Sequence, residues 1–307
     1  MSSLIGMLPS VLMIVSPILI TACGGMICER SGVVNIALEG LMGIGAFAAA
    51  AFHVLNEVAL GGASVWIALL VGAFCGMLMS LIHAFASISL NADQTISGTG
   101  INLIVNGITI FMAQILFNAD RTQPYQMGMK PIMSIGGIYP TAFIALAVVL
   151  IVWFVMYKLP FGLRLRACGE HPQAADSVGI SVYKMRYAGV ILSGILGGIG
   201  GFFYAVSVMD GNSNGHTGVA GFGFLALAVM IFGQWKPVSI FFAALFFAFL
   251  RTVAYSVPLI PFLAALGIDN AIYKMLPYVA TMIILAFTSG KSRAPKAEGI
   301  PYDKGQR

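Results

Sequence analysis

Long apolar runs separated by short polar stretches make up most of the chain. Runs long enough to cross a bilayer occupy residues 4–27, 33–55, 63–86, 98–117, 138–157, 187–209, 218–234, 237–257 and 272–289. A spanning helix needs roughly 20 apolar residues, so this pattern predicts an all-α, polytopic helical membrane protein with about nine spans, within a range of roughly eight to ten. Trp66, Trp153 and Trp235 each lie near the end of a run, where aromatic residues anchor helices at the membrane interface. We expect residues 1–290 to form one transmembrane domain and residues 291–307 a cytoplasmic tail.

Composition supports the membrane assignment and excludes several functions. Of the 307 residues, 59% are hydrophobic and only 9% are charged, whereas about 25% of residues are charged in soluble proteins. No segment remains for a separate soluble catalytic domain. No paired acids, metal-ligand spacing or nucleophile with a base is evident, and the four cysteines form no ligand pattern. We therefore expect no enzymatic activity, no catalytic residues, no bound metal and no cofactor.

The basic residues indicate how the chain is oriented. Ten of the sixteen lysines and arginines fall in residues 158–186 and 291–307. The positive-inside rule places both segments in the cytoplasm, and counting spans outward puts Lys236 on the same side and Arg121 and Lys130 outside. Because orientation accounts for the net charge of +5, we expect no nucleic-acid partner.

Three motifs extend across most of the chain. ERSGVVNIALEGLM covers residues 29–42, GLRLRACGE begins a second motif at residues 162–180, and GFGFLALAVMIFG covers residues 221–233. These motifs resemble permease subunits of ATP-binding-cassette (ABC) importers in the ribose and nucleoside branch, which also resembles branched-chain amino acid permeases. The similarity is greatest to nucleoside permeases.

The resemblance implies that residues 158–186 form a loop coupled to an ATPase. Residues 173–179 have the spacing of the EAA-x3-G element that importer permeases present to their ATPase, with Gln173 in place of the usual glutamate. A short helix with small side chains can fit a groove on a nucleotide-binding subunit. The predicted coupling residues are Arg164, Arg166, Glu170, Gln173, Ala174, Ala175, Asp176 and Gly179. The alternative is an ordinary solvated loop.

The resemblance also implies partners. They are an ABC ATPase subunit, a second permease subunit that is identical or homologous, and an extracytoplasmic substrate-binding protein or lipoprotein that delivers a small-molecule solute. The chain would lie in the bacterial cytoplasmic membrane. It has no phosphate-binding loop of its own, because Gly290-Lys291-Ser292 lacks the required glycine five positions earlier, where Leu285 stands.

Polar residues within the apolar runs are candidates for the substrate path. Charged and polar groups at membrane depth are costly and usually face a water-filled path or the interior of the bundle. Asn35 and Glu39 are four residues apart, which would put them on one face of a helix. The predicted path residues are Asn35, Glu39, Asn102, Asn106, Thr109 and Gln114. The same groups can instead hold helices together. Arg251 lies deep in its run, and the sequence identifies no partner for it.

These features predict import of nucleosides by alternating access, driven by a separate ATPase. One alternative is a permease for a monosaccharide or a branched-chain amino acid. An amino acid site would need groups for both a carboxylate and an ammonium, whereas the candidate path is mostly amide and hydroxyl. Another alternative is an ion-coupled secondary transporter, which would need carboxylates in several spans. Glu39 is the single acidic residue deep in a clear apolar run.

Overall fold

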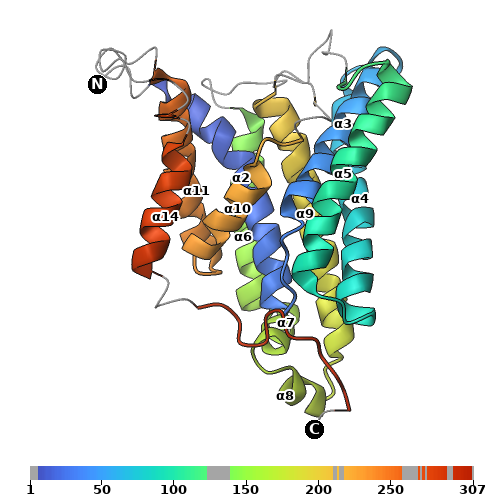
Figure 1. Ribbon diagram of the computed structural model, residues 1–307, viewed down its shortest axis with the longest axis vertical. Coiled ribbons are helices and arrows are strands. Elements are labelled where there is room, and N and C mark those ends of the chain that lie inside the picture. Colours follow the sequence, from blue (N-terminus) through green and yellow to red (C-terminus); the bar gives the residue numbers. More distant parts are fainter. Residues whose placement is uncertain are drawn as a thin grey trace.

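The computed structural model describes residues 6–122, 139–209, 213, 218–257, 269, 272–273, 275–288 and 293–305. These residues form helices joined by turns and connections (Figure 1). The elements are α2 Leu8–Arg30, α3 Leu38–Leu60, α4 Ala63–Ala84, the π-helical turn η1 Phe85–Ser89, α5 Gln94–Phe117, α6 Pro140–Lys158, α7 Pro160–Glu170, α8 Pro172–Ser177, α9 Val182–Ser207, α10 Phe222–Phe232, α11 Pro237–Tyr255 and α14 Leu276–Thr288. The predicted all-α class is confirmed.

Each of the nine predicted runs coincides with a helix, but the helices differ in length. Within the described residues, seven are long and apolar enough to cross a membrane: α2, α3, α4 with η1, α5, α6, α9 and α11. The runs 218–234 and 272–289 contain shorter helices, α10 with 11 residues and α14 with 13. At 1.5 Å per residue, α10 is about 16 Å long, roughly half the hydrocarbon thickness. It therefore begins or ends inside the bundle.

Helices α2 and α9 form the centre of the bundle, with α3 and α4 packed against α9. Glycines on facing helices allow this close packing. A methyl group added at Gly198 of α9 would overlap the backbone of Gly72 in α4. By contrast, α5 and α6 bury little of their length and expose apolar side chains such as Phe111 and Leu150. Their outer faces are suited to lipid or to another subunit.

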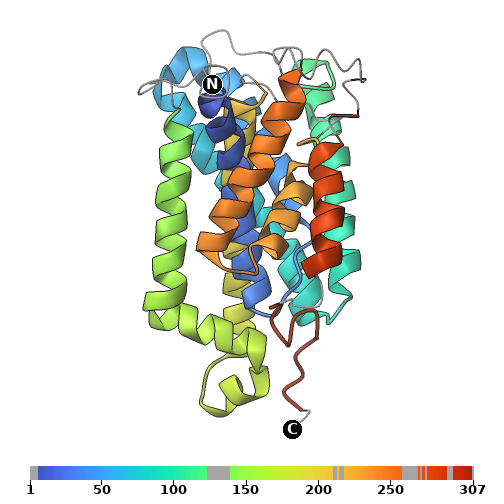
Figure 2. The same ribbon diagram turned by 90° about the vertical axis from the view of Figure 1, so that its left-hand side faces the viewer.

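Helices α7 and α8 project beyond one end of the bundle, and Figure 2 shows α6 leading down into them. The predicted loop 158–186 is thus largely helical. Residues 293–305 lie at this same end, and α2 begins at the opposite end (Figure 1). Lys130, residues 291–292 and residues 306–307 lie outside the described residues.

Candidate functional site

A break in the helical structure lies between α2 and α3. Residues 31–37 are not helical, and they lead back into the bundle before α3 starts at Leu38 (Figure 1). The second residue of the break is Gly32, whose φ of 96° is left-handed and favours glycine. The predicted helix over residues 33–55 therefore starts five residues late. Asn35 does not share a helix face with Glu39, so that prediction was wrong.

Side chains of other helices bind the backbone of this connection. The Val34 N–H donates to Gln94 Oε1 at 2.7 Å, and the Val34 carbonyl pairs with His83 Nε2 at 3.0 Å. His83 is fully buried, so its ring is committed to this contact and to Ser97 Oγ at 2.9 Å. Non-helical backbone is tolerated at membrane depth only when protein or water pairs its polar groups. The chain meets that requirement with side chains from α4 and α5.

The Asn102 side chain hydrogen-bonds backbone groups at the start of α3. Its Nδ2 donates to the Ile36 carbonyl at 2.9 Å, and its Oδ1 accepts from the Gly40 N–H at 2.7 Å. Asn102 lies eight residues after Gln94, about 12 Å along the axis of α5. The start of α3 is therefore inside the bundle, and the Asn102 amide is used to hold it there.

Glu39 caps a second helix that starts inside the bundle. Its carboxylate accepts from the N–H groups of Gly221 at 2.8 Å, Gly223 at 2.7 Å and Phe224 at 3.2 Å, at the beginning of α10. The first N–H groups of a helix lack partners within the helix and favour negative charge. Gly223 also lies so close to Glu39 that an added methyl group would overlap its backbone. Helices α3 and α10 thus start next to each other.

Asn35 connects the same region to the central helix. Its Nδ2 donates to Ser193 Oγ of α9 at 2.7 Å, and its N–H donates to Glu29 Oε1 at 3.5 Å. The Oδ1 atom is buried and has no hydrogen-bond partner among the described residues. Asn35 therefore has one amide atom available at the helix break.

The predicted stripe on α5 divides into two faces. Asn102 and Thr109 are buried, and Thr109 Oγ1 donates to the carbonyl of Asn106 at 3.1 Å. Asn106 and Gln114 are exposed. The Asn106 amide oxygen lies beside the segment leading into α10, 3.1 Å from where a β-carbon on Gly218 would stand. Asn106 is thus an exposed polar residue of α5 that lies beside the segment leading into α10.

Arg251 has partners that its sequence position did not reveal. Its guanidinium stacks 4.0 Å above the ring of Phe222 and donates to the Ala220 carbonyl at 3.4 Å. It lines a cavity of about 520 Å³ together with Tyr204 and Tyr255. The predicted path residues do not line this cavity. Arg251 and the capping carboxylate instead hold the start of α10 from two sides.

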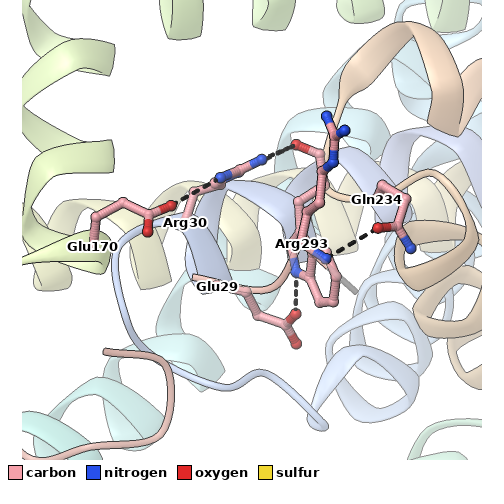
Figure 3. Close-up of polar contacts among 6 residues, drawn as sticks. Glu29, Arg30, Glu170, Gln234 and Arg293 are labelled. Atoms are coloured by element: carbon pink, nitrogen blue, oxygen red, sulfur yellow. Dashed lines mark hydrogen bonds and ion pairs between the residues drawn. The ribbon is translucent and has the colours of Figure 1, made fainter. Parts of the chain in front are cut away.

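A polar cluster at the α7–α8 end was missed from the sequence (Figure 3). Arg30 pairs with Glu170 at 3.4 Å and donates to the Trp235 carbonyl at 3.1 and 3.2 Å. Trp235 Nε1 donates to Glu29 Oε2 at 2.6 Å. Trp235 is only 4% exposed, so its predicted role as an interfacial anchor was wrong. The charged pair Glu29 and Arg30 at the end of an apolar run was the available signal.

The short helix α8 exposes some predicted coupling residues and buries another. Gln173 and Ala174 are exposed, whereas Ala175 is 4% exposed and packs against Cys168 and Val182. The Ala175 side chain therefore faces the interior of the projection, and our expectation that its small size fits a partner's groove was wrong. The physical reason is that a six-residue helix needs a buried face to be stable.

Gly179 and its neighbours complete the tip of the projection. Gly179 has a φ of 83°, a left-handed backbone conformation that favours glycine. Space is not the reason, because no atom lies within 4 Å of an added β-carbon. The preceding Val178 is 74% exposed. Asp176 is partly buried. The turn thus presents an apolar side chain outward.

The remaining basic residues of the projection differ in their surroundings. Arg164 is exposed, whereas Arg166 stacks 4.6 Å from the ring of Tyr157. The contact of Arg166 with Tyr157 therefore joins α7 to α6. In the part of the chain that the structure describes, no group of three His, Cys, Asp or Glu side chains could hold a metal ion.

Comparison with known proteins identifies the family. Residues 7–286 match the family described as branched-chain amino acid transport system / permease component. The chain is 42% identical to the guanosine ABC transporter permease protein NupQ of Bacillus subtilis, covering 97% of each chain. It is 40% identical to the nucleoside ABC transporter permease protein NupC of Lactococcus lactis, covering 95% of this chain and 94% of that protein.

A third relative has a different named solute. It is the putative glucose ABC transporter permease protein TsgC13 of Haloferax volcanii, 30% identical over 94% of this chain and 92% of that protein. No solved structure matches the chain. Permease components of ABC systems are not enzymes; they work with an ATPase and a substrate-binding protein in the bacterial cytoplasmic membrane. The chain belongs to the family of branched-chain amino acid transport system permease components.

Proposed function

We propose that this permease moves nucleosides inward across the membrane by alternating access, powered by a separate ATPase. The observation that carries the proposal is the full-length similarity to two nucleoside permeases, at 42% and 40% identity. The relative named for glucose is more distant, at 30%. This ranking favours a nucleoside over a monosaccharide.

The exposed polar face of α5 and the helix break beside it form the proposed substrate path. Asn106 and Gln114 are exposed on a spanning helix, where a polar side chain would be costly against lipid. Facing a second permease subunit across a water-filled path, their amides can donate to and accept from ribose hydroxyls and base edges. In transporters, helices that break near the midplane often form the substrate site. The second subunit is identical or homologous to this one.

Asn102 and Glu39 have a different part in this proposal. Their polar atoms are bonded to backbone groups of α3 and α10. A side chain that is already paired gains little by binding a solute. Both residues therefore shape the path by holding the two helix starts, and Asn106 and Gln114 contact the solute.

The α7–α8 projection is the proposed docking element for the ATPase, and we place it in the cytoplasm. Its tip exposes Gln173, Ala174 and Val178. The ion pair of Glu170 with Arg30 joins the projection to the end of α2. A movement of α8 can thus be transmitted through this ion pair to the central helices. The substrate-binding protein, a lipoprotein or a soluble protein, delivers the solute at the opposite end.

Uptake into proteoliposomes tests the proposed substrate. The permease is reconstituted with its ATPase, its partner permease and the binding protein, and uptake of labelled guanosine, glucose and leucine is compared. We expect ATP-dependent uptake of guanosine at least about tenfold above that of the other two, a difference of about 1.4 kcal/mol. Faster uptake of glucose or leucine would assign the permease to another solute.

Replacing Val178 by aspartate tests the docking element. The side chain is 74% exposed, so the change leaves packing intact but puts a charge on the apolar contact. We expect the ATPase to co-purify poorly, and Val178→Ala to give an intermediate result. Wild-type co-purification by both variants would show that the ATPase docks elsewhere.

A further inference from the structure

The C-terminal residues 293–305, here called the C-terminal strap, run across the end of the bundle beside α7 (Figure 1). The strap begins where the Arg293 N–H donates to Gln234 Oε1 at 3.0 Å, in the turn between α10 and α11 (Figure 3). The sequence predicted a cytoplasmic tail over residues 291–307. The structure adds that residues 293–305 pack against the rest of the protein.

Backbone bonds tie the middle of the strap to two elements. The Ala297 N–H donates to the Gly169 carbonyl of α7 at 2.9 Å, and the Gly299 N–H donates to the Gly32 carbonyl at 3.3 Å. Gly169 lies so close to Arg30 that an added methyl group would overlap the Arg30 backbone. The strap thus lies along the junction between the coupling projection and the helix break.

Glu298 adds a side-chain contact at this junction. Its carboxyl group hydrogen-bonds to the carboxyl group of Glu29, the residue that also accepts from Trp235. Burial raises the pKa of Glu298, whereas the hydrogen bond to Glu29 and the charge of Arg30 lower it. The strap is therefore joined to the polar cluster at the end of α2.

Helix α9 holds the last part of the strap. Arg186 is almost fully buried, and its Nη1 donates to the Ile300 carbonyl at 2.9 Å. The Tyr183 hydroxyl donates to the Tyr302 carbonyl at 3.2 Å, and the two rings make an edge contact at 5.6 Å. A buried arginine used on a backbone carbonyl indicates that the strap is part of the fold.

Tyr302 supplies the surface on which α8 rests. It is 5% exposed and packs in one apolar cluster with Cys168, Ala175 and Val182. Helix α8 has six residues and is too short to be stable alone. Its one buried face is therefore stabilised by contacts that include the ring of Tyr302.

We propose that the C-terminal strap is a positioning element for coupling, in which Tyr302 holds α8 in the orientation that the ATPase docks against. The backbone bonds to Gly169 and Gly32 then connect that orientation to α2 and the helix break. This inference rests on the proposed role of α7 and α8 as the docking element. It adds that the docking element is built from two parts of the chain, residues 160–177 and residues 293–305.

Cys168 reports whether the strap is in place. It is fully buried in the Tyr302 cluster, and burial raises the pKa of its thiol to about 11. Because the thiolate is the reactive form, maleimide should label it slowly. Labelling is measured with Cys23, Cys28 and Cys75 replaced by alanine. Ending the chain after residue 292, or Tyr302→Ala, should accelerate labelling of Cys168 at least about tenfold, since each pKa unit regained gives about tenfold more thiolate.

Two control variants keep the measurement specific. Tyr302→Phe retains the ring, and Lys304→Ala alters an exposed strap residue. Both should label within about twofold of the parent. Unchanged labelling in the truncated protein would show that the strap does not cover the cluster and would overturn the proposal.

Coupling is measured on the complex with the ATPase. Truncation and Tyr302→Ala should lower ATPase co-purification at least about threefold and raise the ATP hydrolysed per solute transported, while the solubilised permease still shows a cooperative thermal unfolding transition. Tyr302→Phe should restore both values. Wild-type co-purification and coupling in the truncated protein, or the absence of a cooperative unfolding transition in Tyr302→Ala, would overturn the positioning role. If the wild-type complex imports no nucleoside but co-purification still depends on Tyr302, the substrate proposal fails and the strap proposal stands.

Discussion

The polar side chains at the start of α3 and those on the outer face of α5 have opposite surroundings, although they lie within a few turns of each other. Glu39 and Asn102 bind five backbone groups between them, those of Ile36, Gly40, Gly221, Gly223 and Phe224. Asn106, one turn along from Asn102, is exposed. Residue type and depth are similar, so the difference lies in the partners that the fold provides.

The comparison separates residues that build the path from residues that can contact a solute. A buried backbone group left unpaired costs about 1–3 kcal/mol, so removing a side chain that pairs one should destabilise the protein. Removing an exposed amide should leave the free energy of unfolding nearly unchanged and affect uptake alone. Stability and uptake measured on the same variants therefore test the assignment.

The largest effect is expected for Glu39→Leu. It leaves three N–H groups at the start of α10 without their acceptor, so the free energy of unfolding should fall by about 3–6 kcal/mol. Thermal unfolding and folded yield in detergent measure the loss. Glu39→Gln keeps one acceptor oxygen, so its free energy of unfolding should lie between those of the wild type and Glu39→Leu. A stable Glu39→Leu protein that fails only in uptake would place Glu39 in the path instead.

Asn102→Leu should come next. The change unpairs the Gly40 N–H and the Ile36 carbonyl while keeping a similar volume, so we expect a loss of about 2–4 kcal/mol. The same unfolding measurement applies. Stability equal to wild type would mean that water replaces the amide, and Asn102 would then return to the list of solute contacts.

Asn106→Leu is the matched variant on the exposed face. Unfolding should change by less than about 0.5 kcal/mol, as for other exposed sites. Nucleoside uptake should fall about tenfold, equivalent to about 1.4 kcal/mol of lost binding. ATPase co-purification serves as the control for assembly. A stability loss as large as that of Asn102→Leu would remove the distinction between the two faces.

Gln114→Leu should have the smallest effect. Gln114 lies eight residues beyond Asn106, which is about 12 Å farther along α5 from the helix break. Uptake should fall by roughly threefold because the residue contacts a passing solute away from the proposed site. Initial uptake rates at several nucleoside concentrations measure it. A loss greater than that of Asn106→Leu would move the main contact away from the helix break.

Much of the fold followed from local sequence signals. Each of the nine apolar runs predicted a helix that the structure contains, and the motif at residues 173–179 predicted a short helix, which is α8. The start of α3 was misplaced because the apolar run is continuous through residues 33–37. Hydropathy measures how apolar a segment is, and a buried irregular segment can be as apolar as a helix. Hydropathy therefore could not locate the start of α3.

The sequence also did not predict which side chains of the projection are buried. Ala175 and Ala174 are the same residue type in adjacent positions, yet one faces the Tyr302 cluster and the other faces outward. A six-residue helix is too short for a repeating pattern to show its buried face. Part of the packing surface comes from Tyr302, more than a hundred positions along the chain. Local pattern therefore predicted the element, and only the assembled protein oriented it.

Apolar length, charge placement and motif spacing are properties of neighbouring residues, and they alone indicated the all-α class, the approximate places of the apolar helices and the family resemblance. The partners of the polar groups required the tertiary structure. Asn35 meets Ser193 across 158 positions, and Glu39 meets Gly223 across 184. An amide or carboxylate within the membrane must find some partner, but its identity depends on which helices pack together. That packing decided that Glu39 and Asn102 hold helix starts while Asn106 remains exposed.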